Sequence, residues 1–219
     1  MKRILALSFF FIFLSTTSAF AQLTVGGKIG GASTNLTGVG MMDFIPDPKI
    51  KFMGGAIVNY AIGNRIGLQA EVIYQGKGSA FQYYYEDKVR RGLLKVEQKL
   101  GYVSIPTMLQ FKMGDRFNYF HFDAGVVSNY LVHEKFTGTI DIENDKGETI
   151  SEGENFELEA TPAHFDLSYA FGIGLVANGL NFDFRYEVGT NKVFPNDEGS
   201  PEILNKSFQV SIGYTIRAF

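Results

Sequence analysis

The chain has 219 residues, of which 20 are lysine or arginine and 23 are aspartate or glutamate, and it contains no cysteine. This length suits a single domain, and the acidic balance argues against nucleic acid, which binds to a basic surface. Without cysteine the protein has neither disulfides nor thiolate zinc sites, so its stability comes from other interactions.

The N-terminal segment carries the pattern of a secretory signal peptide. Two basic residues begin it, an apolar stretch from Ile4 to Leu14 follows, and Ala19-Phe-Ala21 is a small-x-small cleavage site. We therefore predict a signal peptide at residues 1–21 and one mature domain at residues 22–219. An uncleaved membrane anchor is the alternative, but the apolar stretch is well short of the roughly 18 residues that such a helix needs.

Apolar and polar residues alternate repeatedly along the mature chain. Alternation is clearest over Leu180–Val188 and Phe208–Ile216, where every second side chain is large and apolar. A period of two is typical of β-strands with two unlike faces. The pattern predicts eight strands, at about Leu23–Ser33, Ile50–Ile62, Ile66–Lys77, Leu100–Met113, Tyr119–Val132, Ala163–Ala177, Leu180–Val188 and Phe208–Ile216.

Two local signals refine these strands. Pro106 lies inside the fourth predicted strand, and because proline lacks the N–H that a sheet ladder uses, we expect a bulge or a local break there. Asn178-Gly179 separates the sixth and seventh strands and predicts a type I′ hairpin turn, since both residues tolerate a positive φ.

Short and long connections alternate between the predicted strands. In an up-and-down barrel alternate connections lie at the same end, so the tight turns and both termini share one rim. Outer-membrane barrels have this arrangement, with periplasmic turns and extracellular loops. We expect the long connections to be polar loops, or to extend the strands at their inner ends; they are Thr34–Lys49, Ser79–Lys99, His133–Pro162 and Gly189–Lys206.

Alternation alone does not decide which face of the barrel points outward. A soluble periplasmic barrel that binds a lipid would turn the apolar face inward and leave the charges in solvent. Three features favour the opposite orientation: the polar face is rich in glycine, it carries charges of both signs, and many of the 21 phenylalanines and 11 tyrosines lie near strand ends, as in aromatic girdles. We predict an all-β, eight-stranded antiparallel transmembrane barrel.

Eight strands enclose little more than their own side chains, so we expect a polar plug rather than a pore. Charges persist inside such a barrel only where they find partners, and Glu71 and Arg185 are the expected centre of the plug. A path for protons or ions is the alternative role. The predicted interior charges are Glu71, Lys77, Asp123, Asp183, Arg185, Glu187 and Arg217.

Three segments carry a more specific pattern: Glu71-Val-Ile-Tyr-Gln-Gly-Lys-Gly78, Leu100-Gly-Tyr-Val-Ser-Ile-Pro106 and Phe122-Asp-Ala-Gly125. Together they resemble the outer-membrane β-barrel family of Bacteroidetes that includes the PorT-like proteins, with Val103 in place of the usual leucine. The resemblance implies an integral outer-membrane protein of a diderm bacterium and a role beside the type IX secretion apparatus. It supplies no catalytic residues.

The last residue adds an ambiguous signal. Outer-membrane barrels typically end in an aromatic residue, and Phe219 stands at that place. The alternation, however, assigns Phe219 to the polar face with Arg217. We therefore expect either a bulge before Phe219 or an end of strand pairing ahead of it.

We expect no catalytic residues, cofactor or metal site, since the three histidines lie on separate elements without metal-ligand spacing. A rim enzyme built from His133, Asp166 and Ser168 is the less favoured alternative. The acidic third loop could hold calcium, although its glycine is misplaced for an EF-hand; the residues are Asp141, Glu143, Asp145 and Glu148.

Aromatic and basic residues of the second long connection are candidate contacts for a protein or for a lipopolysaccharide phosphate. Membrane-girdle aromatics with a basic rim are the alternative interpretation. We expect a monomer that contacts outer-membrane lipid, lipopolysaccharide and a protein partner outside the membrane or in the secretion apparatus, and no nucleic acid. The candidate contacts are Tyr83, Tyr84, Tyr85, Arg90 and Arg91.

Overall fold

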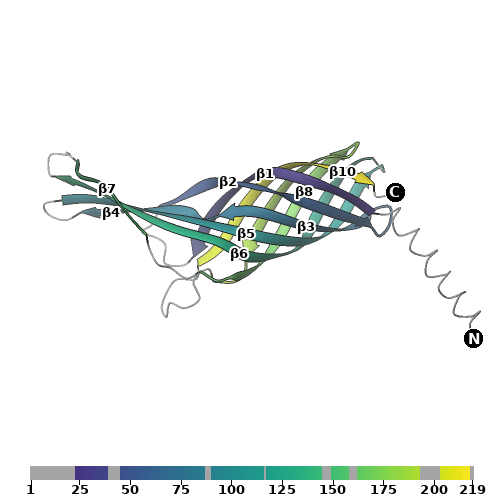
Figure 1. Ribbon diagram of the computed structural model, residues 1–219. Helices are drawn as coiled ribbons and strands as arrows, with labels where there is room; N and C mark the ends of the chain where they lie inside the picture. Colours follow the sequence, from purple (N-terminus) through teal and green to yellow (C-terminus); the bar gives the residue numbers. More distant parts are fainter. Residues whose placement is uncertain are drawn as a thin grey trace, which may run out of the picture.

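The computed structural model describes residues 23–38, 45–86, 90–115, 117–144, 149–157, 162–192 and 203–217. Over these ranges the chain forms one antiparallel sheet of ten strands (Figure 1). No helix in the described ranges has the length and apolar character needed to cross a bilayer. The strands are β1 (Leu23–Gly38), β2 (Ile45–Ala61), β3 (Ile66–Lys77), β4 (Ser79–Glu86), β5 (Arg90–Gly114), β6 (Asn118–Asn144), β7 (Thr149–Glu157), β8 (Phe165–Ala177), β9 (Leu180–Gly189) and β10 (Ile203–Arg217).

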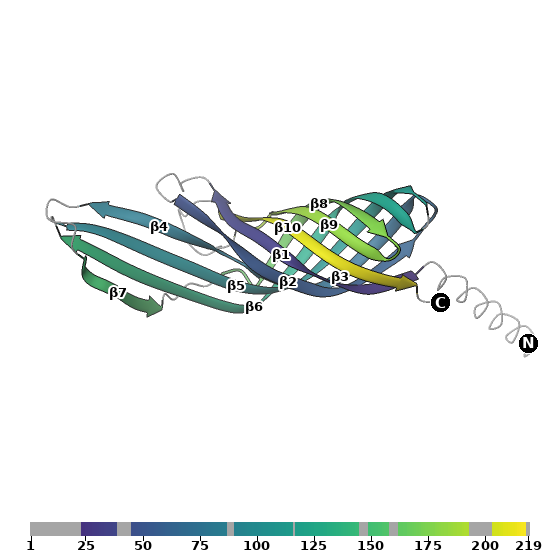
Figure 2. The same ribbon diagram turned by 90° about the horizontal axis from the view of Figure 1, so that it is seen from above.

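Eight of the described strands close into a barrel. β1, β2, β3, β5, β6, β8, β9 and β10 pair in that order, and β10 pairs back with β1 from Thr24–Arg217 to Gly38–Ile203. The strands wrap obliquely around the barrel axis (Figure 2). The predicted eight-stranded, antiparallel up-and-down barrel is therefore confirmed, and each predicted strand ends within one residue of the observed strand at the rim that carries the tight turns. We call this rim the short-turn end.

At the opposite end, two strands continue far past the barrel. β5 has 25 residues and β6 has 27, whereas a strand needs about 9–11 residues to cross a bilayer. β4 pairs with the start of β5, and β7 pairs with the end of β6 (Figure 1). We call β4, β7, Arg90–Lys99 of β5 and His133–Asn144 of β6 the sheet extension.

The sheet extension corrects the prediction of irregular loops at Ser79–Lys99 and His133–Pro162. These segments are rich in aromatic and β-branched residues, which favour extended pairing. The alternative expectation, that the inner ends of the long connections lengthen the strands, is confirmed here.

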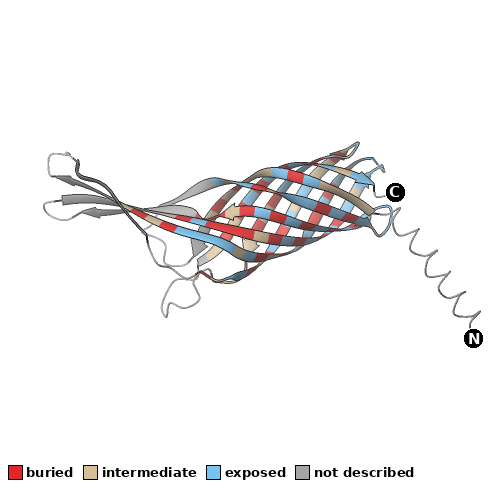
Figure 3. Cartoon of the chain, in the orientation of Figure 1, coloured by how far each residue is buried: buried red, intermediate tan, exposed pale blue. Residues whose placement is uncertain are grey.

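Buried and exposed residues alternate along the barrel strands (Figure 3), and the exposed ones are largely apolar whereas most of the buried ones are polar. On β9, Phe182 and Phe184 are 46% and 45% exposed, whereas the alternating residues Asp183 and Arg185 are 6% and 3% exposed. The predicted orientation is confirmed, because an exterior of this kind suits lipid. A soluble barrel with an apolar interior is contradicted by the same alternation.

Pro106 interrupts pairing on only one side of its strand. Among the described pairs, the β3–β5 ladder has none at Ile105 or Pro106, whereas the β5–β6 ladder continues through Pro106 opposite Val127. The expected local break is thus found toward β3, where the missing N–H matters. The register shift of β5 against β6 lies elsewhere, between Gly101 and Tyr102.

The Asn178-Gly179 turn has the predicted geometry. Asn178 has a φ of 50° and Gly179 a φ of 88°, so both central residues adopt the positive φ of a type I′ turn. The predicted signal peptide and Phe219 lie outside the described residues.

Candidate functional site

Most buried side chains in the lumen of the barrel are polar, and they come from all eight barrel strands; two small apolar clusters, one around Met53 and one around Met108, lie among them. Their arrangement follows the period-two alternation, which turns every second residue inward. β9 shows the order best, because its lumen-facing residues from the short-turn end outward are Asn181, Asp183, Arg185 and Glu187. The network can accordingly be described at three levels along the barrel.

At the central level, Glu71 of β3 receives two cations. Arg185 of β9 donates through Nη2 to Oε1 at 2.7 Å and through Nη1 to Oε2 at 3.0 Å, and the Lys28 ammonium of β1 lies 2.8 Å from Oε2. The two-pronged contact is the strong geometry for arginine and a carboxylate. The structure thus brings together the two residues that were expected at the centre, and it adds Lys28, which the sequence analysis missed.

At the outer level, Glu187 of β9 is the shared acceptor. Lys77 Nζ lies 2.7 Å from Oε1, Asn129 Nδ2 donates to Oε1 at 3.0 Å, and Gln209 Nε2 donates to Oε2 at 2.7 Å. Lys77 also lies 5.3 Å from the ring centroid of Tyr102. Four strands, β3, β6, β9 and β10, are joined by this one carboxylate, so its charge is well compensated.

At the level nearest the short-turn end, His121 lies between two carboxylates. Its Nδ1 is 3.0 Å from Asp123 Oδ1, and its Nε2 is 3.4 Å from Asp183 Oδ1. All three side chains are buried. The register explains the meeting: His121 of β6 is opposite Gly174 of β8, which in turn is opposite Asp183 of β9. Glycine at 174 leaves the ring room to reach across β8.

The histidine cluster was missed by the sequence analysis, which placed the histidines on separate elements. Its one sequence signal is the pair of glycines, Gly172 and Gly174, on the polar face of β8. Those glycines become informative only once the register with β6 and β9 is known.

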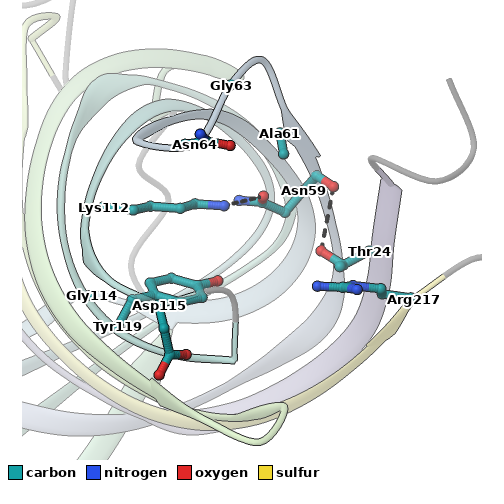
Figure 4. A pocket seen from close by; sticks show the side chains of 10 residues that line it. All are labelled: Thr24, Asn59, Ala61, Gly63, Asn64, Lys112, Gly114, Asp115, Tyr119 and Arg217. Carbon is teal, nitrogen blue, oxygen red and sulfur yellow. Dashed lines mark hydrogen bonds between the residues drawn. The ribbon is translucent and has the colours of Figure 1, made fainter. Parts of the chain in front are cut away.

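A cavity of about 610 Å³ opens at the short-turn end (Figure 4). Lys112 Nζ donates to Asn59 Oδ1 at 2.8 Å and lies 5.1 Å from the ring centroid of Tyr119. Asn59 in turn donates to Gln69 Oε1 at 3.3 Å and to Gln110, so an amide network closes the cavity toward the lumen. The remaining lining residues are Thr24, Ala61, Gly63, Asn64, Gly114, Asp115 and Arg217.

Arg217 is a correction to the predicted interior set. It is exposed at the mouth of this cavity, with its guanidinium 5.0 Å from the ring centroid of Phe117. It is the last residue of β10 and pairs with Thr24 at the end of the barrel, beyond the packed lumen. The neighbouring Asp115 accepts backbone hydrogen bonds from Phe117 and Asn118, each 2.7 Å long, which lower the pKa of its carboxyl group.

The other predicted sites are not assembled. His133 is exposed, whereas Asp166 and Ser168 are buried in the lumen, so the proposed rim enzyme is not formed by these residues. Of the candidate calcium ligands, Asp141 and Glu143 lie on β6, and the other two lie outside the described residues. The candidate contacts Tyr83, Tyr84, Tyr85, Arg90 and Arg91 lie on β4 and β5 in the sheet extension.

The family model of the outer membrane protein beta-barrel domain matches residues 20–195. The chain belongs to this family. In outer-membrane barrels the short turns face the periplasm, so the short-turn end of this barrel is its periplasmic end. No curated protein sequence matches the chain.

Several solved outer-membrane proteins are similar to this barrel in structure. The attachment invasion locus protein Ail of Yersinia pestis is 13% identical, with 88% of this chain and 98% of that chain covered and a TM-score of 0.39. Neisserial surface protein A is 12% identical, with coverage of 90% and 97% and a TM-score of 0.40. OprG of Pseudomonas aeruginosa is 9% identical, with coverage of 89% and 95% and a TM-score of 0.37.

Proposed function

We propose that this barrel is a monomeric, non-catalytic outer-membrane protein that binds a protein partner outside the cell through its sheet extension. The observation that carries the proposal is the continued pairing of β5 with β6 as far as Arg90 opposite Asn144. The residues Arg90–Lys99 alone extend the sheet by about 30 Å at roughly 3.4 Å per residue. The membrane requires no such length.

The form of the extension supports binding by strand addition. β7 is the last strand in the sheet order, and among the described residues it pairs only with β6. An edge strand presents unpaired backbone donors and acceptors that an extended segment of another protein can use. The barrel itself is closed and leaves no barrel edge for a second copy of the chain to cover, which supports a monomer.

Contacts with lipid and lipopolysaccharide belong to the same proposal. The apolar exterior would contact the outer-membrane lipid, and Arg90 and Arg91 would supply charge to lipopolysaccharide phosphates or to the partner. Tyr83, Tyr84 and Tyr85 on the paired strand β4 would contribute aromatic contact surface.

In-cell photo-crosslinking tests this function. A photoreactive residue at Glu154 of β7 should yield a discrete crosslinked product, and one at the lipid-facing Phe171 should not. Ser151→Pro should abolish the product, because proline within an edge strand disrupts the backbone pairing that strand addition needs, whereas the matched Ser151→Ala should retain it. A product that survives Ser151→Pro in a correctly inserted barrel would rule out binding at this edge.

A second candidate is the accessory role in type IX secretion that the PorT-like resemblance implies. It is favoured by the three resembling segments, which lie on the neighbouring strands β3, β5 and β6 and whose Lys77 and Tyr102 are in contact in the lumen. Deletion of the gene should stop secretion of type IX cargo, and normal secretion in the deletion strain would exclude the role. N-terminal sequencing of the mature protein should begin at Gln22 if the predicted signal peptide is cleaved.

A further inference from the structure

The histidine cluster at the periplasmic level of the lumen contains buried polar atoms that the described protein leaves unpartnered. Both carboxylate oxygens of Asp183, His121 Nε2 and Asn181 Oδ1 have no hydrogen-bond partner among the described residues. His121, Asn181 and Asp183 are 1%, 3% and 6% exposed. Burying such atoms without a partner is unfavourable, and for a carboxylate especially so.

The nearest cations are already engaged. Lys28 and Arg185 lie one level further out, and both bind Glu71 at 2.7–3.0 Å. Lys112 lies on the other side, where its ammonium donates to Asn59. Among the described side chains, His121 is the one group of potential positive charge within ion-pair distance of Asp183, and Lys28 and Arg185 act on this carboxylate from further away.

The separation between His121 and Asp183 suits two ligands of one metal ion. Nε2 and Oδ1 face each other at 3.4 Å without the geometry of a hydrogen bond. Two ligand atoms held about 2.0–2.1 Å from a tetrahedral Zn²⁺ are about 3.3–3.4 Å apart. The ligand-type atoms of His121, Asp123 and Asp183 all lie within 4.8 Å of one another.

The surroundings of His121 hold the ring in the orientation that a metal ligand needs. Asp123 Oδ1 lies 3.0 Å from Nδ1, so an ionised Asp123 that accepts from Nδ1–H leaves the Nε2 lone pair free for a metal ion. Carboxylate–histidine pairs of this kind are usual behind metal-binding imidazoles. Gly174 keeps the space beside the ring open, because a Cβ there would clash with His121 Nε2 and lie 2.7 Å from the Phe182 carbonyl oxygen.

We propose that this cluster binds a divalent transition-metal cation of the Zn²⁺ class. His121 Nε2, the Asp183 carboxylate and Asn181 Oδ1, the last from the same face of β9 as Asp183, are the three protein ligands, and water completes the coordination. Asp123 is a positioning residue. The ion would tie β6 to β9 across β8. Tyr119, whose ring centroid is 6.1 Å from that of His121, lies between the cluster and the cavity at the periplasmic end, which it lines.

The test is metal analysis of the untagged, detergent-solubilised protein dialysed against Zn²⁺. Wild type should retain about one Zn²⁺ per chain, and Co²⁺ in its place should give the visible spectrum of a tetrahedral site. His121→Gln and Asp183→Asn should lose the ion. His133→Gln and His164→Gln, which alter exposed histidines outside the lumen, are matched controls that should retain it.

A variant of the positioning residue Asp123 distinguishes a bound metal ion from a proton on His121. Asp123→Asn should keep the ion but weaken its binding by about 10–100-fold, as expected for loss of an orienting carboxylate. Heat-modifiable gel mobility identifies folded variants. If His121→Gln does not fold, the Zn²⁺ affinity of Asp123→Asn and the Co²⁺ spectrum of wild type decide whether the cluster binds the ion. The proposal is overturned if folded wild type takes up no Zn²⁺, in which case a proton compensates the carboxylates, or if folded His121→Gln keeps a full equivalent.

Discussion

The central and periplasmic levels of the lumen differ in how the charge of a buried carboxylate is compensated. At the centre, Glu71 is paired with two cations at 3.0 Å or less. At the periplasmic level, Asp183 keeps two oxygens without hydrogen-bond partners in the described structure. A fully paired cluster needs nothing further and acts as internal support, whereas an incompletely paired one has capacity for a ligand.

Arg185→Leu should break the central level. It removes both guanidinium hydrogen bonds from Glu71 and leaves Lys28 as the only described cation on a buried carboxylate, so the free energy of unfolding should fall by about 3–5 kcal/mol. Urea titration followed by the folded band on an unheated gel measures the change. Arg65→Leu, in an exposed turn, is the matched control and should have little effect. Equal midpoints for the two variants would show that the central level is not the support of the barrel.

Zn²⁺ should stabilise the periplasmic level and not the central one. At a free concentration 100 times its dissociation constant, an ion that binds only the folded barrel adds about 2.7 kcal/mol to the free energy of unfolding. The same urea titration with and without Zn²⁺ measures the gain, which should vanish in Asp183→Asn. A gain that persists in Asp183→Asn would assign the stabilisation to another site.

Gly174→Ala should damage the periplasmic level from the neighbouring strand. The added methyl group would displace the His121 ring from its place beside Asp183, at about 1–3 kcal/mol for an overpacked site, and Zn²⁺ binding should be lost with it. Gly63→Ala is the matched control, because a Cβ there has no neighbour within 4 Å among the described residues. Unimpaired Zn²⁺ binding by Gly174→Ala would show that the ring needs no such space.

The difference between the two levels also marks what the sequence could reveal. Alternation predicted the strands, their periplasmic ends and the inward orientation of Arg185. A strand with one apolar and one polar face in a closed membrane barrel turns the apolar face to the lipid and the polar face to the lumen. The pairing of Glu71 with Arg185 could be predicted from the sequence, since opposite charges in a narrow lumen must meet. The histidine cluster could not be predicted, because it depends on the register that aligns His121, Gly174 and Asp183 across three strands.

The sheet extension escaped prediction for a different physical reason. Beyond the membrane neither face of a strand is obliged to be apolar, so alternation there is weaker evidence for a strand than it is within the barrel. Charged residues such as Lys95, Glu97 and Lys99 therefore gave Arg90–Lys99 the composition of a loop, although its backbone is paired with β6 throughout and with β4 over residues 91–97.

Shortening the extension should have the smallest effect on the barrel. Replacing residues 82–95 and 139–155 each by Asn-Gly would close the β4–β5 and β6–β7 hairpins near the membrane, at the pairs Phe81–Val96 and Gly138–Phe156. The removed segments contain none of the residues that contact Glu71 or Glu187 in the described structure, so the free energy of unfolding should change by less than about 1 kcal/mol, as for other changes away from the packed interior. The urea midpoint of the folded gel band checks this. A loss as large as that expected for Arg185→Leu would make the extension part of the folding unit, and its length would then reflect stability rather than the binding of a partner.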